Sequence, residues 1–293
     1  MASRTPRFNL SAVVGIVVGV AMETNLTGME WKETKTMAKT RLLVTTALVV
    51  LLGAALIAAA GDYDYRDEID RSFTLPRGGS VSLDNVNGDV TVSVWNSDEV
   101  RVQATKSASS ADLLDRLEVE ISETGSTLRI ETRYPSQKGG WGHHGQSKVE
   151  YTLTVPVWAN LDGFDLVNGN LRVDGLDGDI DAESVNGTIE LIDVAGSVDA
   201  DTVNGSLEVV ATRIRPGAEV DLESVNGTID LRLAPGVGVD VDAESVNGRI
   251  RNDFGIEVHK GKWVGSDMRG VVGDGGLKVS METVNGGIRL SSD

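Results

Sequence analysis

The phrase Ser184-Val185-Asn186-Gly187 is the main indicator of architecture in this 293-residue chain, because it returns three times at almost constant spacing. The other close copies are Thr202-Val203-Asn204-Gly205, Ser224-Val225-Asn226-Gly227 and Ser245-Val246-Asn247-Gly248. Three more Val-Asn-Gly copies end at Gly88, Gly169 and Gly286, and successive glycines from Gly169 lie 18, 18, 22, 21 and 38 residues apart. A period near twenty is typical of a solenoid. The last gap, about two periods, indicates a repeat without its signature or an insertion.

The flanks of each copy also match, as in Asp181-Ala182-Glu183 before the phrase and Thr188-Ile189-Glu190-Leu191 after it. Alternation of this kind predicts strands. Asn-Gly adopts positive φ at little cost, so it is expected to form the corner between two strands. The sequence therefore predicts an all-β parallel β-helix, or β-solenoid, of about 20-residue coils, with a more irregular β-rich N-terminal part.

A meander of antiparallel hairpins is the competing interpretation, since Asn-Gly between alternating runs is also a strong hairpin signal. A hairpin gives no reason for Val to precede Asn-Gly each time, or for Ser or Thr to precede Val. Stacked coils do, because they place identical positions about 4.8 Å apart. The solenoid is therefore favoured, with a Val column inside and a ladder of Asn amides bonded between coils. The structural residues of these repeats are Asn168, Asn186, Asn204, Asn226, Asn247, Asn285, Gly169, Gly187, Gly205, Gly227, Gly248 and Gly286.

The N-terminal region is interpreted as a targeting segment. Residues 37–60 combine a basic start, an apolar core and the small residues Ala58-Ala59-Ala60, which is the layout of a signal peptide. An uncleaved membrane anchor over 42–60 is the alternative. Residues 1–36 are expected to be an over-extended start. The chain is thus predicted to be exported, to the periplasm or to the cell surface and extracellular space.

Four further segments are predicted downstream. Residues 61–72 are expected to be an acidic linker, 73–160 the N-terminal β-rich part of the solenoid, and 161–293 the Val-Asn-Gly repeats with an insertion at 254–276. A short helix is expected at 108–116, where Ser109 or Ser110 can cap it. The insertion is predicted to project from the stack, with the repeat that contains Asn285 as the last coil.

Composition excludes several functions. The chain has no cysteine, so disulfides, thiolate chemistry and a lipid-modified cysteine are unavailable. It carries 44 acidic and 27 basic residues, a formal charge of −17, which argues against nucleic acid as a partner. No cofactor is expected.

Several motifs together resemble a known family. They are Phe73-x-x-Pro76-x-Gly78-Gly79, Asn85-Val86-Asn87-Gly88-Asp89-Val90 followed by Trp95, the strand from Tyr151 to Pro156, and the serial Ser/Thr-Val-Asn-Gly copies. Over residues 70–292 the chain resembles the bacterial β-strand-repeat, adhesin-like family that was long a domain of unknown function. The resemblance implies an exported, non-catalytic β-solenoid at the cell envelope. It carries no functional residues over to this chain.

No catalytic residues are assigned. The sequence holds no nucleophile elbow, zinc motif or phosphate-binding loop. His143 and His144 are adjacent beside Trp141, but neighbouring histidines rarely share one metal ion without further ligands, so a surface loop is favoured there. His259 stands alone. A polysaccharide-active enzyme remains an alternative, because parallel β-helices also host such enzymes.

Acidic residues recur once per repeat and define two columns. Asp165, Glu183, Asp201, Glu223 and Glu244 share one position, and Asp181, Asp199, Asp221 and Asp242 share another. A solvated acidic face that keeps a repetitive sheet soluble is the simpler interpretation. Weak binding of a cation such as Ca²⁺ is the alternative, for which the candidate residues are Asp181, Glu183, Asp199, Asp201, Asp221 and Glu223. No metal site is assigned with them.

The predicted function is that of a non-catalytic envelope protein, an adhesin-like structural or interaction module with an acidic, repetitive β surface. Its expected partner is a cell-surface polymer or an envelope protein, with membrane contact only through residues 42–60 if they are retained. A membrane-anchored accessory in envelope stress or signalling is the second alternative, beside the enzyme.

Overall fold

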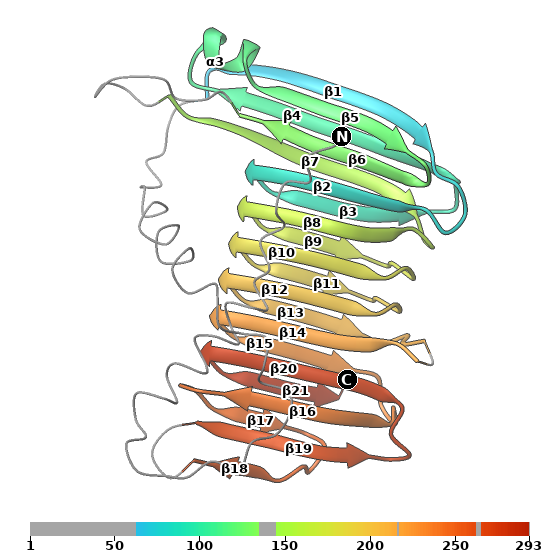
Figure 1. Cartoon of the computed structure of the whole chain (residues 1–293), viewed down its shortest axis with the longest axis vertical. Helices are drawn as coiled ribbons and strands as arrows, with labels where there is room; N and C mark the ends of the chain where they lie inside the picture. Colours follow the sequence, from blue (N-terminus) through green and yellow to red (C-terminus); the bar gives the residue numbers. More distant parts are fainter. Residues whose placement is uncertain (1–62, 135–144, 216, 262–264, 293) are drawn as a thin grey trace.

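The computed structural model describes residues 63–134, 145–215, 217–261 and 265–292. Within these residues, 21 strands form sheet A, of ten strands, and sheet B, of eleven (Figure 1). The helix in this part, α3 (Ala111–Asp115), begins after Ser110, whose side chain accepts a hydrogen bond from the Leu113 N–H. The all-β class expected from the sequence is confirmed. The segments 1–36 and 37–60, together with His143 and His144, lie outside the described residues.

Each Val-Asn-Gly copy joins one strand of sheet B to one strand of sheet A, and such a pair is called a repeat unit below. In spatial order the units are β2 (Ser80–Asn87) with β3 (Val90–Trp95), β8 (Asn160–Asn168) with β9 (Leu171–Asp174), β10 (Ile180–Asn186) with β11 (Ile189–Ile192), β12 (Val198–Asn204) with β13 (Leu207–Ala211), β14 (Glu219–Asn226) with β15 (Ile229–Leu233), β20 (Leu277–Asn285) with β21 (Ile288–Ser292), and β16 (Val239–Ser245) with β17 (Ile250–Asn252). Neighbouring units pair in parallel in both sheets. The hairpin interpretation is therefore wrong, because the two strands of a unit belong to different sheets.

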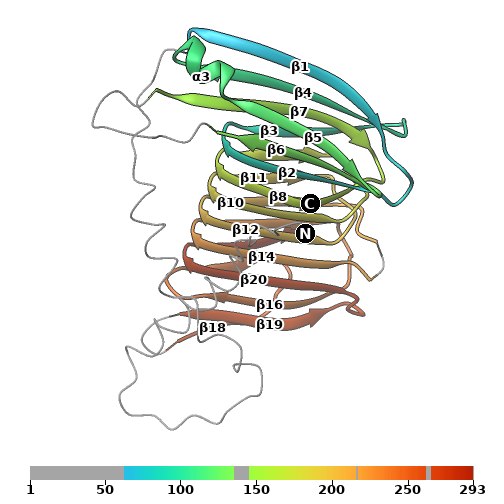
Figure 2. The ribbon, with the colours of Figure 1, turned by 45° about the horizontal axis from the view of Figure 1, so that its top comes forward.

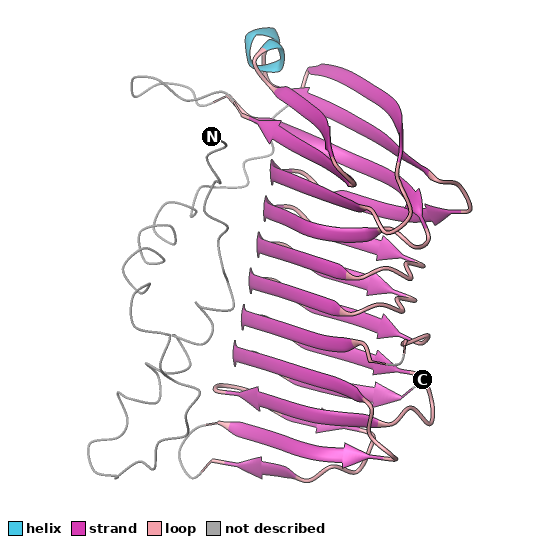
Figure 3. Cartoon of the chain, turned by 45° about the vertical axis from the view of Figure 1, so that its right-hand side comes forward, coloured by secondary structure: helices cyan, strands magenta, loops and turns pink. Residues whose placement is uncertain are grey.

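The core lies between the two sheets. The strands of each sheet lie one above another as regular rungs in Figure 3. In β10, Ile180 and Ala182 are buried in this core, and Asp181 and Glu183 alternate with them. Successive side chains of a strand point to opposite faces, so the apolar positions of both sheets meet inside. One continuous apolar cluster then extends from Leu75 to Leu290.

The Ser or Thr of each phrase has a specific role at the corner. Its hydroxyl donates a hydrogen bond to the carbonyl of the glycine in the neighbouring unit: Thr202 Oγ1 to Gly187 O at 3.2 Å and Ser224 Oγ to Gly205 O at 3.3 Å. Thr202 and Ser224 have no exposed surface. A buried backbone carbonyl without a donor is costly, so the repeat keeps a hydroxyl there.

The glycine that ends each phrase is needed for close approach. The sequence predicts positive φ at these corners, but among the described residues only Gly88, of the seven copies, has it (φ 121°). A Cβ built on Gly205 would instead lie 1.9 Å from Gly187 O. Stacked corners therefore bring a carbonyl so close to each glycine that no side chain fits.

The predicted ladder of Asn amides between units is confirmed. The Val column is buried, but in a cluster of its own and not in the core between the two sheets. Val203, Val225, Val246 and Val284, with Val185 at their margin, form a small cluster separate from the core. The Asn side chains are exposed or half-buried. From Asn168 onward, each Nδ2 donates to the Oδ1 of the preceding Asn in the stack at 2.8–3.0 Å. In space this ladder runs through Asn87, Asn168, Asn186, Asn204, Asn226, Asn285 and Asn247. Strand alternation explains why the Val column lies outside the core, because the residues before Val already occupy the inward face.

The last repeat unit in the sequence is not the last in space. Strand β20 lies between β14 and β16 (Figure 2). Strand β21 lies between β15 and β17 (Figure 1). The insertion at 254–276 also does not project. Its strand β19 (Ser266–Val272) pairs antiparallel with β16, Met268 is fully buried, and β18 (Val258–Lys260) pairs with β19. The segment therefore caps sheet B, and the chain then crosses back to fill an internal position.

Antiparallel strands also close the N-terminal end. They are β1 (Tyr65–Thr74), β4 (Glu99–Ala108) and β7 (Ser147–Pro156) in sheet A, and β5 (Glu118–Thr124) with β6 (Thr127–Arg133) in sheet B. Most of the expected linker is thus strand β1, paired with β4 over ten residues. Ion pairs between Arg101 and Asp70 (2.5 Å) and between Lys106 and Asp67 (2.7 Å) hold this edge. The charges that suggest a linker are those of an exposed edge strand.

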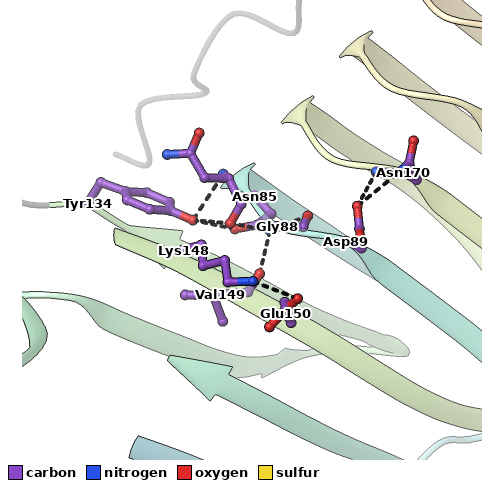
Figure 4. A network of polar contacts seen from close by, with 9 residues as sticks. Asn85, Gly88, Asp89, Tyr134, Lys148, Val149, Glu150 and Asn170 are labelled. Carbon is purple, nitrogen blue, oxygen red and sulfur yellow. Dashed lines mark hydrogen bonds and ion pairs between the residues drawn. The ribbon is translucent and has the colours of Figure 1, made fainter. Parts of the chain in front are cut away.

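The corner of the first unit is adapted to β7. Asn85 replaces Ser or Thr there, and its Nδ2 donates to Val149 O at 2.9 Å (Figure 4). The Tyr134 hydroxyl donates to Asn85 Oδ1 at 2.8 Å and accepts from the Asn87 N–H at 3.0 Å. The longer amide reaches a neighbour that is not a repeat unit, which explains the departure from the repeat phrase.

Candidate interaction surface

The outer face of sheet B carries two columns of acids, which together are called the acidic face. The first acid column contains Asp162, Asp181, Asp199, Asp221 and Asp242, with Ser280 between the last two. The second acid column contains Glu131, Asp84, Asp165, Glu183, Asp201, Glu223, Glu282, Glu244 and Asp267. Register neighbours are separated by about 4.8 Å, and the two columns by about 7 Å, since their members lie two residues apart on a strand.

Sequence repeats reveal only the middle of this face. The six cation candidates, Asp181 to Glu223, lie side by side on β10, β12 and β14 as the repeat spacing predicts. Repeat spacing does not identify Glu131 and Asp267, because their strands lack the repeat phrase, or Asp84, because its copy lies far upstream of the regular ones. It also misses Glu282 between Glu223 and Glu244, because the order of units in space differs from their order in the chain.

Cations are found at the two ends of the acidic face. Arg129 of β6 binds Asp84 at 2.5 Å, and Arg269 of β19 binds Asp242 at 2.9 Å. Both arginines belong to capping strands. The caps therefore neutralise the ends of the columns as well as closing the sheet.

The middle of the face contains carboxylate oxygens without a hydrogen-bond donor. They are Asp201 Oδ1, Asp221 Oδ1 and Glu223 Oε2. Asp201 is only 4% exposed, and its side chain is one methylene shorter than those of its register neighbours Glu183 and Glu223. Burial raises the pKa of Asp201 to about 8 and that of Glu223 to about 9, and neighbouring carboxylates add to both shifts. Burial also raises the pKa of Asp199, Asp221, Glu244 and Glu282.

A shallow groove of about 700 Å³ crosses the starts of β8, β10, β12 and β14. The first acid column lines it through Asp162, Asp181, Asp199 and Asp221. Gly78 and Gly217 also line it. The groove is therefore acidic along its length.

The outer face of sheet A is different. Its register column runs Arg172, Glu190, Glu208, Asp230, Arg289 and Arg251, so positive residues flank three acids. Arg172 forms an ion pair with Glu190. Charge is thus distributed unequally between the two broad sides of the molecule.

The described residues contain no group of three or more His, Asp or Glu side chains arranged to hold a metal ion. His259 lies on the capping strand β18, in register with Asp267. The carboxylates of the acidic face form lines, whereas a metal centre needs oxygen ligands that converge. No helix in the described ranges is both long and apolar enough to cross a membrane.

Comparison with known proteins gives distant structural likenesses. No family model matches the chain, and no curated protein matches it in sequence. A putative cell adhesion protein from Clostridium sporogenes is 13% identical, with 78% of this chain and all of that chain covered, at a TM-score of 0.45. A putative adhesin from Bacteroides fragilis is 14% identical, with 76% and 97% covered, at 0.32. A putative lipid binding protein from Parabacteroides distasonis is 11% identical, with 78% and 97% covered, at 0.26. At these sequence identities and TM-scores, the names apply to those proteins and assign no role to this chain.

Proposed function

We propose that this chain is an exported, non-catalytic interaction module of the bacterial cell envelope, adhesin-like in role and built as a β-solenoid of about 20-residue coils. Its acidic face would bind a cell-surface polymer or an envelope protein that carries basic groups. Membership of the bacterial β-strand-repeat, adhesin-like family, which the sequence motifs resemble, is part of this proposal. The observation that carries it is the second acid column, which crosses sheet B without interruption from Glu131 to Asp267.

An extended acidic row fits a repetitive partner better than a small substrate. A reaction site needs a few groups converging on one point, whereas here equivalent carboxylates recur at each strand. A flexible cationic polymer can contact several of them at once, so that weak individual contacts add up. Such binding is electrostatic and should weaken as salt is added.

Binding to isolated envelope fragments tests the proposal. The double variant Asp181→Asn/Asp199→Asn removes two charges from the acidic face. The control Glu208→Gln/Asp230→Asn removes two charges from sheet A. Co-sedimentation of the full chain over a range of NaCl concentrations should show weaker binding for the first variant and unchanged binding for the control. Equal binding by both variants, or binding insensitive to salt, would contradict the role of the acidic face.

The localisation and the absence of catalysis have their own tests. N-terminal sequencing of the protein from its host should give a product that begins at Gly61. Retention of 42–60 would instead support the membrane-anchored accessory in envelope stress or signalling. Turnover of an envelope polysaccharide that is lost on changing one acid would overturn the non-catalytic role.

A further inference from the structure

The last repeat unit, β20 with β21, fills a slot between two units that precede it in the chain. Without residues 277–292, β14 and β15 would present unpaired backbone groups on one side of the slot, and β16 and β17 on the other. Such edges are templates for strand pairing. At both ends of sheet B, by contrast, the described residues place antiparallel capping strands. The slot would thus open unpaired edges in the middle of both sheets.

The contacts that hold the last unit are the contacts made by every other unit. Asn285 Nδ2 donates to Asn226 Oδ1 at 2.8 Å and its Oδ1 accepts from Asn247 at 3.0 Å. Thr283 Oγ1 donates to Gly227 O at 3.2 Å, and Ser245 Oγ donates to Gly286 O at 2.9 Å. Each of these bonds joins residues 277–292 to a neighbouring unit, and none involves the loop at 273–276. They would form equally well if that unit belonged to another molecule.

A short glycine-rich loop alone ties the last unit to the cap. Val272 and Leu277 are both register partners of Val239, on opposite sides of β16. Residues 273–276 therefore cross the start of β16, a span of about 10 Å, which is two strand spacings. Four loop residues allow about 17 Å when extended. Gly273, Gly275 and Gly276 have positive φ, which lets the chain turn over Gly238.

We propose that the unit formed by residues 277–292 is exchangeable between molecules, and that the partner of the slot is the same unit of a second copy of this chain. Two copies that insert their last units into each other form a symmetric, domain-swapped dimer. The loop at 273–276 holds the unit at a high effective concentration, so closure within one molecule dominates in dilute solution. Exchange becomes favourable at high protein concentration, or when the loop is too short to cross β16.

Disulfide trapping tests the exchange, because the chain has no cysteine of its own. Glu219 and Lys278 are register partners across the slot, and Lys278 Nζ lies 2.7 Å from Glu219 Oε1. Neighbouring in-register strands place Cα atoms within disulfide range. The double variant Glu219→Cys/Lys278→Cys should form the bond within one chain, which verifies the geometry.

Two single variants, Glu219→Cys and Lys278→Cys, are then mixed, unfolded in urea and refolded together under oxidising conditions. Exchange predicts a disulfide-linked heterodimer whose yield rises with protein concentration. The matched control is Asp181→Cys mixed with Asp199→Cys, register partners in units that are not exchanged, which should give no heterodimer. Failure of the slot pair to cross-link between chains at any concentration, while the double variant cross-links within one chain, overturns the proposal.

Loop length provides the second test. Deleting Gly275 and Gly276 leaves three Cα steps, about 10 Å, which has no slack for crossing β16. This variant should elute as a dimer in size-exclusion chromatography, whereas insertion of two glycines after Gly276 should leave a monomer. A folded monomer from the shortened loop overturns the proposal. If the shortened variant does not fold, the mixed refolding of the two single-cysteine variants still tests whether the last unit exchanges between chains.

Discussion

Asn247 donates a hydrogen bond through Nδ2 to Oδ1 of Asn285 at 3.0 Å, although Asn285 follows it by 38 residues. The last amide in the sequence is therefore an inner member of the ladder, and Asn247 is its end. The order of the repeat units in the sequence therefore differs from their order in the stack.

The ladder predicts which Asn substitutions matter. Asn204→Ala and Asn285→Ala each remove two inter-unit bonds, whereas Asn247→Ala removes one. The first two should each lower the free energy of unfolding by about 1–2 kcal/mol, and the third by about half as much, because a net hydrogen bond contributes about 0.5–1.5 kcal/mol. Urea unfolding measures this. A loss for Asn285→Ala no larger than that for Asn247→Ala would contradict the position of the last unit.

The corner glycines should tolerate no side chain. Gly205→Ala would place a Cβ 1.9 Å from the backbone oxygen of Gly187, which forces the units apart. We expect a loss of at least ~3 kcal/mol, at the upper end of overpacking effects. The control is Gly287→Ala, whose Cβ would meet the Arg249 oxygen at 3.3 Å. Thermal melts that showed similar losses for both would argue against close stacking.

Stability should fall as the solution becomes alkaline. The pKa values of Asp201 and Glu223, about 8 and about 9, exceed the ordinary values of 3.8 and 4.5. Between about pH 4 and pH 9 the native state thus binds more protons than the unfolded state, so the free energy of unfolding decreases as pH rises. The contribution is fully present below pH 4, and each group changes it by at most about 1.4 kcal/mol per pH unit.

The variant Asp201→Asn tests this assignment, because the amide has the same shape and does not ionise. Its urea midpoint should change less between pH 6 and pH 9 than that of the unmodified protein. Glu208→Gln on sheet A serves as the control and should keep the full slope. A slope that Asp201→Asn leaves unchanged would assign the pH dependence to other groups.

Calcium should act on the acidic face only as a screening ion. Its carboxylates lie in rows and do not converge, so Ca²⁺ lacks a ring of oxygen ligands. Melting temperatures in CaCl₂ and in NaCl of equal ionic strength should therefore agree. A calcium-specific rise that is lost in Asp199→Asn/Asp201→Asn would instead establish a binding site, since a ligand that binds the native state stabilises it by mass action.

Removal of residues 277–293 should do more damage than loss of a terminal strand pair. The deletion takes two strands from the interior of the sheets and leaves β16 and β17 without their parallel neighbours. The cooperative unfolding transition of residues 239–272 should disappear, as measured by native-state hydrogen exchange. Protection in β16 equal to that of the full chain would show that this part pairs directly with β14.

The repeat phrase predicts the middle of the molecule well, because stacking rewards identical residues at identical positions. Asn186 and Asn204 lie in register, and so do Glu183 and Asp201, as their spacing implies. The sequence pattern does not specify which face of the strand Val203 occupies, and the structure places it outside the core. The repeat period predicts that equivalent residues stack in a column. Whether that column lies in the core depends on how the two sheets pack against each other.

The ends of the molecule could not be predicted by the same reasoning. The charged residues of β1 suggest a linker in the sequence. This edge strand is exposed on both faces, so it lacks the alternation of apolar and polar residues that predicts a strand. Residues 254–276 lack the repeat and still contribute Met268 to the core through an antiparallel pairing. Residues 273–276 cross β16 and place the last unit between two earlier ones. The repeat period gives the spacing of units along the chain but not their order in the sheets.

The difference between the two broad sides has a consequence for orientation. The outer face of sheet B carries acids with few cations, whereas on sheet A Arg172, Arg251 and Arg289 stand beside three acids. An anionic surface therefore repels one side of the molecule more than the other. Close to such a surface, within about a Debye length of 8–10 Å, the protein would experience a torque that turns sheet A toward it and leaves the carboxylate rows pointing away.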